Sequence, residues 1–311
     1  MADGEKLQEF LGTVTLGDLV RGKGELISAS KDAPIKEVLA LMSNYRVMSI
    51  PLTDAENKYV AIVDLLEIMT YVAFASYFKG PDGTAKPQLN KLDLSLPVEE
   101  VTGLSEESKT LWVRKSTDTL PDVLELLSKG VHRLLVENDD DKTVKLLTQT
   151  DVVRFLVARQ DHPAVRAKCD ETLQNARLVD VSGGKPPVTC TTSWTALDCF
   201  RKLYMSDVSA VAIVDKDGTL AGNVSASDVR GLKLSNLESV NKPVLDYLKT
   251  HAGGHLVQPV TADPIRSTVG SVMAQLVAGR VHRVWVVDGS KPIGVVSMTD
   301  IMSKFSPYDY K

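Results

Sequence analysis

The sequence is poor in the residues that build metal centres and disulfide frameworks. Among 311 residues there are three cysteines and five histidines, and Cys169, Cys190 and Cys199 form no Cys-x-x-Cys pair and have no histidine at metal-ligand spacing. An odd number of cysteines, with an N-terminus that lacks the basic-then-apolar layout of a secretion signal, predicts unpaired thiols in a reducing compartment. We therefore expect a cytoplasmic protein, with the nucleus as a second location, and no metal site.

The sequence also lacks an excess of positive charge and a clear membrane span. Its formal net charge is −4, which gives no general attraction to nucleic acid or to an anionic membrane. The longest apolar stretch, residues 59–78, carries Asp64 and Glu67, so we expect no membrane-spanning helix. Hydrophobic residues make up 43% of the chain and charged residues 24%, which is enough for a packed core.

Signatures of catalysis are missing as well. The Gly-rich segment 182–187 lacks the GxxxxGK[ST] spacing of a P-loop and is interpreted as a turn. The histidines form no arrangement with Cys, Asp or Glu that is typical of a nucleophile or a catalytic metal. An enzyme with a regulatory insert is one alternative, but the repeats described next leave no room for a catalytic domain, so we expect no enzyme.

What the sequence does contain is an internal repeat. The segments GVHRLLVENDDDKTVKLLTQTDVVRFL, from Gly130, and RVHRVWVVDGSKPIGVVSMTDIMSKF, from Arg280, share one order: His-Arg, a strand, a turn, a strand, a hydroxyl residue, and Asp three residues later. Segments that start at Arg46 and Asp207 repeat this order without His-Arg. The spacing from the histidine position to the acid agrees within one residue in all four segments, so the chain consists of four repeats.

Each repeat predicts a strand, an amphipathic helix such as 35–42 or 121–127, two further strands and a second helix. This β-α-β-β-α order predicts an α/β fold. A unit of about 60 residues buries too little surface to be stable alone, so we expect consecutive repeats to pair into two modules that form a disc. The predicted modules are 13–159, with repeats at about 13–78 and 97–159, and 176–305, with repeats at about 176–235 and 243–305. A polar connection, 79–109, and a joining segment with possible helix, 160–175, complete the chain.

The acid that follows the hydroxyl residue is the candidate ligand-binding position. The patterns are Thr148-x-x-Asp151, Ser225-x-x-Asp228 and Ser297-x-x-Asp300, with Asp64-x-x-Glu67 in the first repeat. A carboxylate can accept hydrogen bonds from both hydroxyls of a ribose, while the hydroxyl side chain and the helix N-terminus favour a phosphate. The same pattern is also a helix capping box. For one repeat taken alone we favour the cap, above all where the longer Glu67 replaces aspartate.

Two His-Arg pairs decide between these interpretations. His132-Arg133 and His282-Arg283 open the middle strands of repeats 2 and 4, among apolar residues. A long charged side chain at the start of a buried strand needs an anionic partner, which is either a phosphate or a protein carboxylate. The recurrence of the pair at symmetric positions favours phosphate.

The strands GVHRLLVEN and RVHRVWVVD, and the segment DVSAVAIVDKDGTLAGNVSASDV, resemble the cystathionine-β-synthase-type (CBS) repeats of the gamma subunits of AMP-activated and sucrose-non-fermenting-related protein kinases. The resemblance covers about 13–305 and is specific in repeats 2 to 4. It implies that paired repeats form so-called Bateman modules and that the chain is a non-catalytic sensor of AMP, ADP or ATP. It also implies a heterotrimer with a catalytic alpha kinase subunit and a scaffolding beta subunit.

The same resemblance implies roles for individual residues. The phosphate ligands would be His132, Arg133, His282 and Arg283; the ribose ligands Asp151, Asp228 and Asp300; and the hydroxyl contacts Thr148, Thr191, Ser225 and Ser297. Two positions depart from the family, because Glu67 replaces the acid of the first repeat and Asp151 stands where animal members usually carry a basic residue. The alternative function is an interaction scaffold with vestigial sites, whose motif residues serve only as caps and ion pairs.

Overall fold

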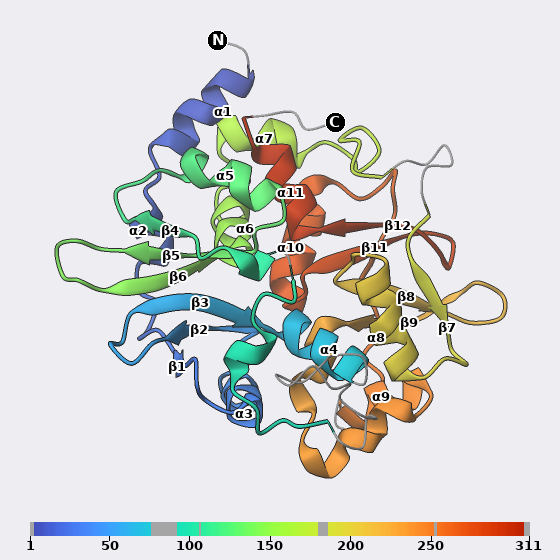
Figure 1. The fold of residues 1–311 in the computed structure, drawn as a ribbon. Helices are drawn as coiled ribbons and strands as arrows, with labels where there is room; N and C mark the ends of the chain where they lie inside the picture. The colour runs from blue at the N-terminus through green and yellow to red at the C-terminus, as the bar shows by residue number, and fades with distance from the viewer. Residues whose placement is uncertain (1–2, 76–91, 106, 180–185, 252–253, 308–311) are drawn as a thin grey trace. The chain divides into compact units, whose positions relative to one another are not determined.

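The computed structural model describes residues 3–75, 92–105, 107–179, 186–251 and 254–307 (Figure 1). Within them each of the four repeats contributes one three-stranded sheet, so the predicted α/β fold with four repeats is confirmed. Parts of the predicted connection 79–109 and of the Gly-rich turn 182–187 lie outside the described residues.

Every sheet has the same topology. The first strand of a repeat pairs in parallel with the middle strand, which pairs antiparallel with the last strand. In chain order the strands are β1 (Ala29–Ser30), β2 (Ser49–Thr53), β3 (Tyr59–Asp64), β4 (Val113–Lys115), β5 (Arg133–Glu137), β6 (Val144–Thr148), β7 (Thr189–Thr191), β8 (Ala210–Val214), β9 (Leu220–Ser225), β10 (Thr261–Ala262), β11 (Arg283–Asp288) and β12 (Lys291–Ser297). Each sheet therefore has the strand order of the repeat itself.

Two helices belong to each repeat. Parallel strands cannot be joined by a tight turn, and the crossover is made by α3 (Ile35–Tyr45), α5 (Leu120–Ser128), α8 (Ala196–Met205) and α10 (Val269–Gly279). The second helix follows the last strand directly and is α4 (Leu65–Phe74), α6 (Gln149–Val157), η5 (Ala226–Gly231) or α11 (Met298–Phe305). In the third repeat this element is a 3₁₀-helix, whereas the other three are α-helices.

The remaining helices lie before and between the repeats. They are α1 (Asp3–Gly12), α2 (Leu16–Val20), η3 (Val98–Val101), η4 (Glu107–Lys109), α7 (Pro163–Cys169), η6 (Leu234–Asn241) and α9 (Val244–His251). Helix α7 falls in the joining segment 160–175, where the sequence allows a helix. Helix α2 begins at a capping box formed by Thr15 and Asp18, and the chain that follows it enters the candidate site described below.

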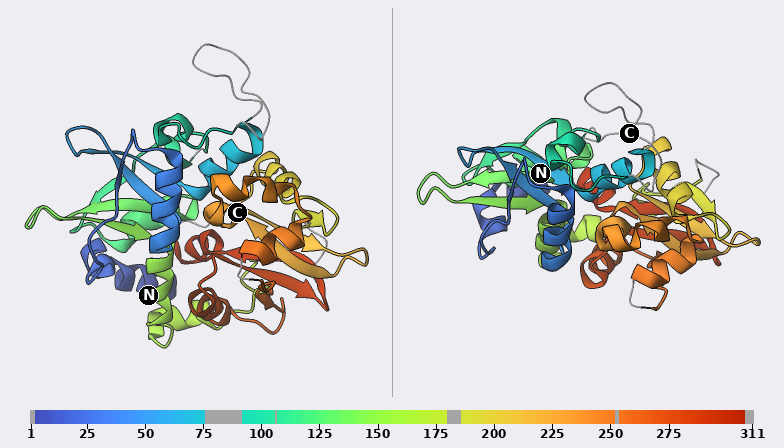
Figure 2. Two further views of the ribbon diagram at one scale, coloured as in Figure 1. Left: turned by 90° about the horizontal axis from the view of Figure 1, so that it is seen from below. Right: turned by 60° about the horizontal axis from the view of Figure 1, so that its bottom comes forward.

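The chain divides into two compact units that alternate along the sequence. Unit 1 comprises Met1–Leu26, Trp112–Pro187 and Val260–Lys311, and unit 2 comprises Ile27–Leu111 and Val188–Pro259. Unit 1 thus holds the sheets of repeats 2 and 4, and unit 2 those of repeats 1 and 3. In unit 1 helices α6, α10 and α11 lie between the two sheets, and in unit 2 helices α4 and α8 do (Figures 1 and 2). The modules predicted from the sequence, 13–159 and 176–305, each combine two consecutive repeats instead. These module boundaries remain a prediction.

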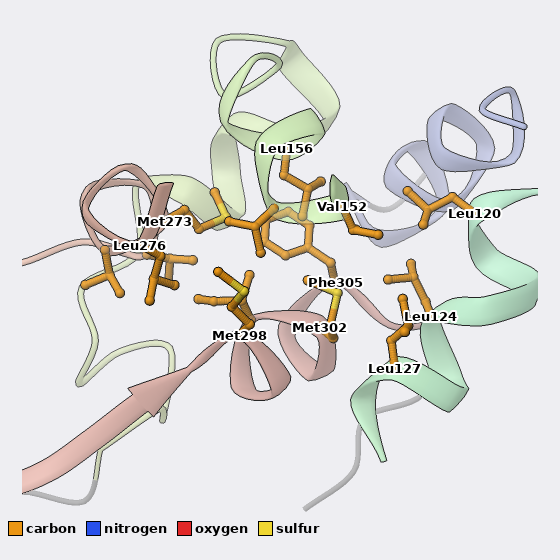
Figure 3. Packing of buried hydrophobic residues seen from close by; sticks show 14 of the residues in the cluster. Leu120, Leu124, Leu127, Val152, Leu156, Met273, Leu276, Met298, Met302 and Phe305 are labelled. Carbon is orange, nitrogen blue, oxygen red and sulfur yellow. The ribbon is translucent and has the colours of Figure 1, made fainter. Parts of the chain in front are cut away.

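Much of the core of unit 1 lies where helices α5, α6, α10 and α11 pack together (Figure 3). Helix α11 packs on α5 and α6, and α10 packs on α6. The side chains that converge there are each at most 2% exposed: Leu120, Leu124, Leu127, Val152, Leu156, Met273, Leu276, Met298, Met302 and Phe305. Their spacing of three and four residues gives each helix one apolar face, so each repeat supplies the surface that the other buries.

Unit 2 is built in the same way around α4, α8 and η5. Phe200 of α8 is fully buried and meets the ring of Tyr247 edge-on, with the ring centroids 5.7 Å apart. The Tyr247 hydroxyl donates to the Asp228 carbonyl oxygen at 2.7 Å. This bond joins α9 to η5 and thereby holds the third-repeat motif in place.

Candidate functional site

Four equivalent sites lie where the last strand of each repeat passes into its second helix. In every repeat the N–H of the first helical residue donates to the carbonyl of the residue at the histidine position, at 3.0 to 3.2 Å. These bonds run from Leu65 to Met48, from Gln149 to His132, from Ala226 to Ser209 and from Met298 to His282. In the antiparallel register, Arg133 faces Thr148 and Arg283 faces Ser297. Each His-Arg pair therefore lies beside the helix cap of its own repeat.

In repeats 2 to 4 one oxygen of the acid completes that cap. The Oδ2 atom of Asp300 accepts from the Ser297 N–H at 2.7 Å and from its hydroxyl at 2.6 Å. Asp151 and Asp228 hold the N–H and hydroxyl of their own capping residues in the same way. The capping interpretation is therefore confirmed. A carboxylate has a second oxygen with free lone pairs, so a cap and a ligand contact are compatible.

The acids differ in what else they touch. Among the described residues, Ser297 is the one other residue that donates to the Asp300 side chain, and neither of its bonds goes to the Oδ1 atom. Burial raises the pKa of the Asp300 carboxyl, and the bonds from Ser297 oppose this shift. Asp300 thus keeps an oxygen for an outside donor, and among the described residues no cation lies against its carboxylate.

Asp151 receives a further donor from a distant part of the chain. The Lys23 ammonium lies 2.5 Å from Asp151 Oδ2 and donates to the Leu146 carbonyl oxygen at 2.6 Å. The Asp151 side chain is 10% exposed and that of Lys23 33% exposed. The sequence pattern contains no sign of this ion pair, because Lys23 lies outside the motif.

Glu67 is enclosed by protein donors on both oxygens. Its Oε2 atom accepts from the Asp64 N–H at 3.0 Å, and its Oε1 atom accepts from the Gly103 N–H at 2.7 Å and from the Ser108 hydroxyl. The side chain is fully buried, and this burial, with the neighbouring Asp64 charge, raises its pKa to about 8. Asp64 caps α4 by accepting from the N–H groups of Leu66 and Glu67. The first repeat thus keeps the cap but offers a ligand no open oxygen of Glu67.

The two second helices of unit 1 begin side by side. The Gln149 side-chain amide donates to Thr299 Oγ1 at 3.0 Å, and the Thr150 hydroxyl contacts Met298 Sδ at 3.4 Å. These four residues open α6 and α11, so the positive ends of two helices meet. Both His-Arg pairs belong to this region, because His132 and His282 accept the first helical N–H of α6 and α11.

The basic residues of this region are accessible to different degrees. His132, Arg133 and Arg283 are half-buried, and His282 is exposed. The strand residues that follow, Leu134 and Val284, are fully buried. The His-Arg pairs therefore lie at the edge of a buried sheet, as the sequence predicts. That these pairs bind a phosphate remains a prediction.

The third-repeat residues lie in unit 2. The Ser225 hydroxyl is 2.7 Å from that of Ser227 and belongs to the cap of η5 with Asp228. Thr191 is exposed at the last position of β7, paired with Val214, whereas Ser225 pairs with Ala210. Four residues of strand separate the two ends, roughly 13 Å at the usual rise. Within its own repeat, Thr191 is therefore not brought to the acid.

Arg230 is a residue of the motif region that the sequence analysis does not single out. It follows Asp228 by two residues, and the matching positions hold Met69, Val153 and Met302, all fully buried. Arg230 is half-buried, its Nε is shielded from solvent without a hydrogen-bond partner, and burial lowers its pKa. Aligning the four repeats two residues past the acid would have revealed this cation in an apolar position.

Within the part of the chain that the structure describes, no group of three or more His, Cys, Asp or Glu side chains could hold a metal ion. In the same residues no helix has the length and apolar character needed to cross a membrane.

Comparison with known proteins gives the family. The CBS domain model matches residues 22–73, 109–158, 180–234 and 257–307, so the chain belongs to the CBS domain family. These four matches correspond to the four repeats. The family is regulatory and generally non-catalytic, and the chain is a CBS domain regulatory protein.

The chain is similar to curated proteins with two different names. The SNF1-related protein kinase regulatory subunit gamma-like PV42b of Arabidopsis thaliana is 24% identical over 346 residues, covering 92% of each chain. Protein SDS23 of Candida albicans is 27% identical over 211 residues, covering 65% of this chain and 33% of that protein. The match therefore spans about a third of the Candida protein. Among solved structures, protein MJ1225 of Methanocaldococcus jannaschii has the same fold, with a TM-score of 0.70, 17% identity, and coverage of 94% of this chain and 100% of that chain.

Proposed function

We propose that this chain binds adenine nucleotides (AMP, ADP or ATP) and serves as the gamma-type regulatory subunit of a heterotrimeric Ser/Thr protein kinase in the cytoplasm or nucleus. The observation that carries the proposal is the meeting of two helix N-termini in unit 1, each with a His-Arg pair at its first turn. Helix N-termini and guanidinium groups both favour phosphate. Two helix N-termini and two His-Arg pairs in the same region suit a ligand that carries more than one negative charge.

The residues have distinct roles in this proposal. Arg133 and Arg283, with His132 and His282, bind the phosphates. Asp300 holds a ribose through its Oδ1 atom while Oδ2 continues to cap α11. Asp228 has the same relation to Ser225 and is the corresponding ribose ligand in unit 2. Arg230, two residues further along, supplies an additional cation there.

Hydroxyl groups complete the proposed sites, with Thr148, Ser225 and Ser297 acting from the caps. Thr191, at the far end of β7 from the acid of its repeat, takes no part in this proposal. Because both oxygens of Glu67 are occupied by protein donors, we infer that this residue stabilises the first repeat and binds no ribose. Asp151 is treated separately below.

Regulation follows if the nucleotides bind unequally to two arrangements of the protein. A ligand shifts such an equilibrium only by its differential affinity for the two states, and phosphate number is the feature on which AMP, ADP and ATP differ. The gamma-like name of the Arabidopsis relative supports kinase catalytic alpha and scaffolding beta subunits as partners.

Isothermal titration with AMP, ADP and ATP tests the nucleotide site. We expect the wild type to bind, and Arg283→Met and Asp300→Asn to bind about 10- to 100-fold more weakly, since a hydrogen bond to a charged group contributes about 1.5 to 3 kcal/mol. Arg266→Met, at an exposed position outside the motif, is the matched control. Absence of binding to the wild type would refute the sensor function. Co-purification with kinase alpha and beta subunits tests the partnership.

An interaction scaffold is the second candidate function. The complete caps favour it, because every motif acid already has a structural role. The relatives named protein SDS23, unlike PV42b, are not named as kinase subunits, which is consistent with a role outside a kinase. A scaffold predicts that nucleotides leave the melting temperature unchanged in the wild type and in Arg283→Met alike.

A further inference from the structure

The segment that follows α2 is fastened to repeat 2 at the acid. Lys23 Nζ donates to Asp151 Oδ2 at 2.5 Å and to the Leu146 carbonyl oxygen at 2.6 Å. Lys145, next to Leu146 on β6, donates from its own ammonium to the Gly24 carbonyl oxygen at 2.9 Å. Three bonds between residues more than 120 positions apart define a specific contact between the segment and the strand.

The Lys23 ammonium gives Asp151 Oδ2 a third donor, beside the N–H and hydroxyl of Thr148 at 2.8 and 2.7 Å. That oxygen has no lone pair left, and Asp151 Oδ1 is the oxygen that no donor of the described residues reaches, as in Asp300. What Lys23 adds is an ammonium bound directly to the carboxylate, and such charge-assisted hydrogen bonds are the stronger ones. A ribose hydroxyl that approaches this carboxylate therefore competes with a cation already in place.

The fourth repeat provides the comparison inside the same unit. Asp300 makes the same cap, with Ser297 at 2.7 and 2.6 Å, but among the described residues no lysine lies against its carboxylate. The two motifs are alike in sequence, Thr-x-x-Asp and Ser-x-x-Asp. They differ in the residue that a distant segment brings to the carboxylate.

We propose that Lys23 is a built-in competitor of the ribose at Asp151, so that repeat 2 is closed to nucleotide while Lys23 is in place. This inference rests on the proposed nucleotide-binding function. It identifies the acid of unit 1 that binds the ribose of the nucleotide. Lys23 determines site number, and Asp151 binds nucleotide only after the ammonium leaves. Unit 1 of the native chain uses Asp300 alone.

Equilibrium dialysis with radiolabelled AMP measures the number of nucleotides bound per chain. We expect Lys23→Ala to bind one more AMP than the wild type and Lys23→Arg, which keeps the cation, to bind the wild-type number. Asp151→Asn in the wild-type background should leave the number unchanged. Lys23→Ala combined with Asp151→Asn should lose the added site, which assigns that site to repeat 2.

Two results would overturn the inference. One is that Asp151→Asn, made in the otherwise native chain, binds one AMP fewer than the wild type. Asp151 would then bind a nucleotide while Lys23 is present. The other is a folded Lys23→Ala protein that binds no more AMP than the wild type. If Lys23→Ala does not fold, Lys23→Gln serves as the second variant in the same measurement.

The proposed function is tested separately in the same experiment by Asp300→Asn, which should remove one AMP from the wild type. If the wild type binds no AMP but Lys23→Ala binds one, the native sensor function fails and the competitor role of Lys23 stands. If neither binds, both proposals fail.

Discussion

The clearest quantitative prediction concerns the buried carboxyl group of Glu67. Burial, and then the charge of Asp64, raise its pKa to about 8 from an ordinary value of 4.5. In the unfolded chain Glu67 loses its proton above about pH 4.5, whereas the folded protein keeps that proton until about pH 8. The folded state then binds more protons than the unfolded state, so stability falls as pH rises through this window. Above pH 8 this contribution becomes constant.

The magnitude follows from the width of the window. One pKa unit corresponds to about 1.4 kcal/mol, so between pH 5 and pH 8 the limiting loss is about 3 to 4 kcal/mol. Glu67→Gln removes the titration and keeps the side-chain shape. Its amide cannot accept from both the Asp64 and the Gly103 N–H, which adds a cost of about 1 to 3 kcal/mol that does not vary with pH.

Urea unfolding of the wild type and Glu67→Gln at pH 5, 6, 7 and 8 provides the measurement. The stability of the variant relative to the wild type should improve with each pH step, by about 1 kcal/mol per unit and at most 1.4. Titration of other groups, Asp300 included, is common to both proteins and cancels in the difference. Glu37→Gln, on the exposed side of α3, is the matched control. A difference that is constant from pH 5 to pH 8 would mean that Glu67 is ionised in the folded protein.

Three further predictions concern stability without nucleotide. Arg230→Met should raise the melting temperature by a few degrees, which corresponds to a gain of about 1 kcal/mol in the free energy of unfolding. The reason is that methionine, which repeats 1 and 4 bury at this position, replaces a half-buried cation. A lower melting temperature would contradict this expectation. Ser297→Ala should cost about 1 kcal/mol in urea unfolding by removing the cap of α11, and an unchanged midpoint would argue against the cap. Phe305→Ala should cost about 3 to 5 kcal/mol in the same assay, since its ring is fully buried among four helices, and a loss below 1 kcal/mol would place the ring outside the core.

Much of the fold could be predicted because each repeat carries its own local pattern. The run at 35–42 and the strands around residues 47–54 and 59–63 have helical and alternating periods, and they correspond to α3, β2 and β3. The cap was likewise readable, since Ser297-x-x-Asp300 specifies a local hydrogen bond. The 3₁₀ form of η5 and the grouping of repeats 2 and 4 into one unit have no comparable local signal. They depend on packing between distant elements.

The contacts that distinguish the four motif acids could not be predicted from the sequence either. Lys23 and Asp151 are 128 residues apart, and Ser108 and Glu67 are 41 apart. Neither Lys23 nor Ser108 belongs to the repeated pattern, so comparing one repeat with another could not reveal them. Arg230 differs in this respect, because it occupies a repeat position whose other occupants are all apolar.

These contacts share a structural origin. Lys23 lies in the segment that leads into β1 of repeat 1, and it reaches the acid of repeat 2. Gly103 and Ser108 lie in the segment that leads toward β4 of repeat 2, and they reach the acid of repeat 1. In the first half of the chain, therefore, each acid is covered by the connection into the other repeat.

Such an arrangement separates the two tasks of the motif. Capping requires only the hydroxyl residue, the acid and the helix that follows, so selection for folding preserves the pattern in every repeat. Binding requires in addition that no cation or donor from the connecting segments be bound to the carboxylate beyond its cap. Counting Ser-x-x-Asp patterns therefore gives the number of caps, whereas the number of ligands follows from the segments that lie over them. A change as small as Lys23→Ala could then alter how many nucleotides the chain senses without altering a single repeat.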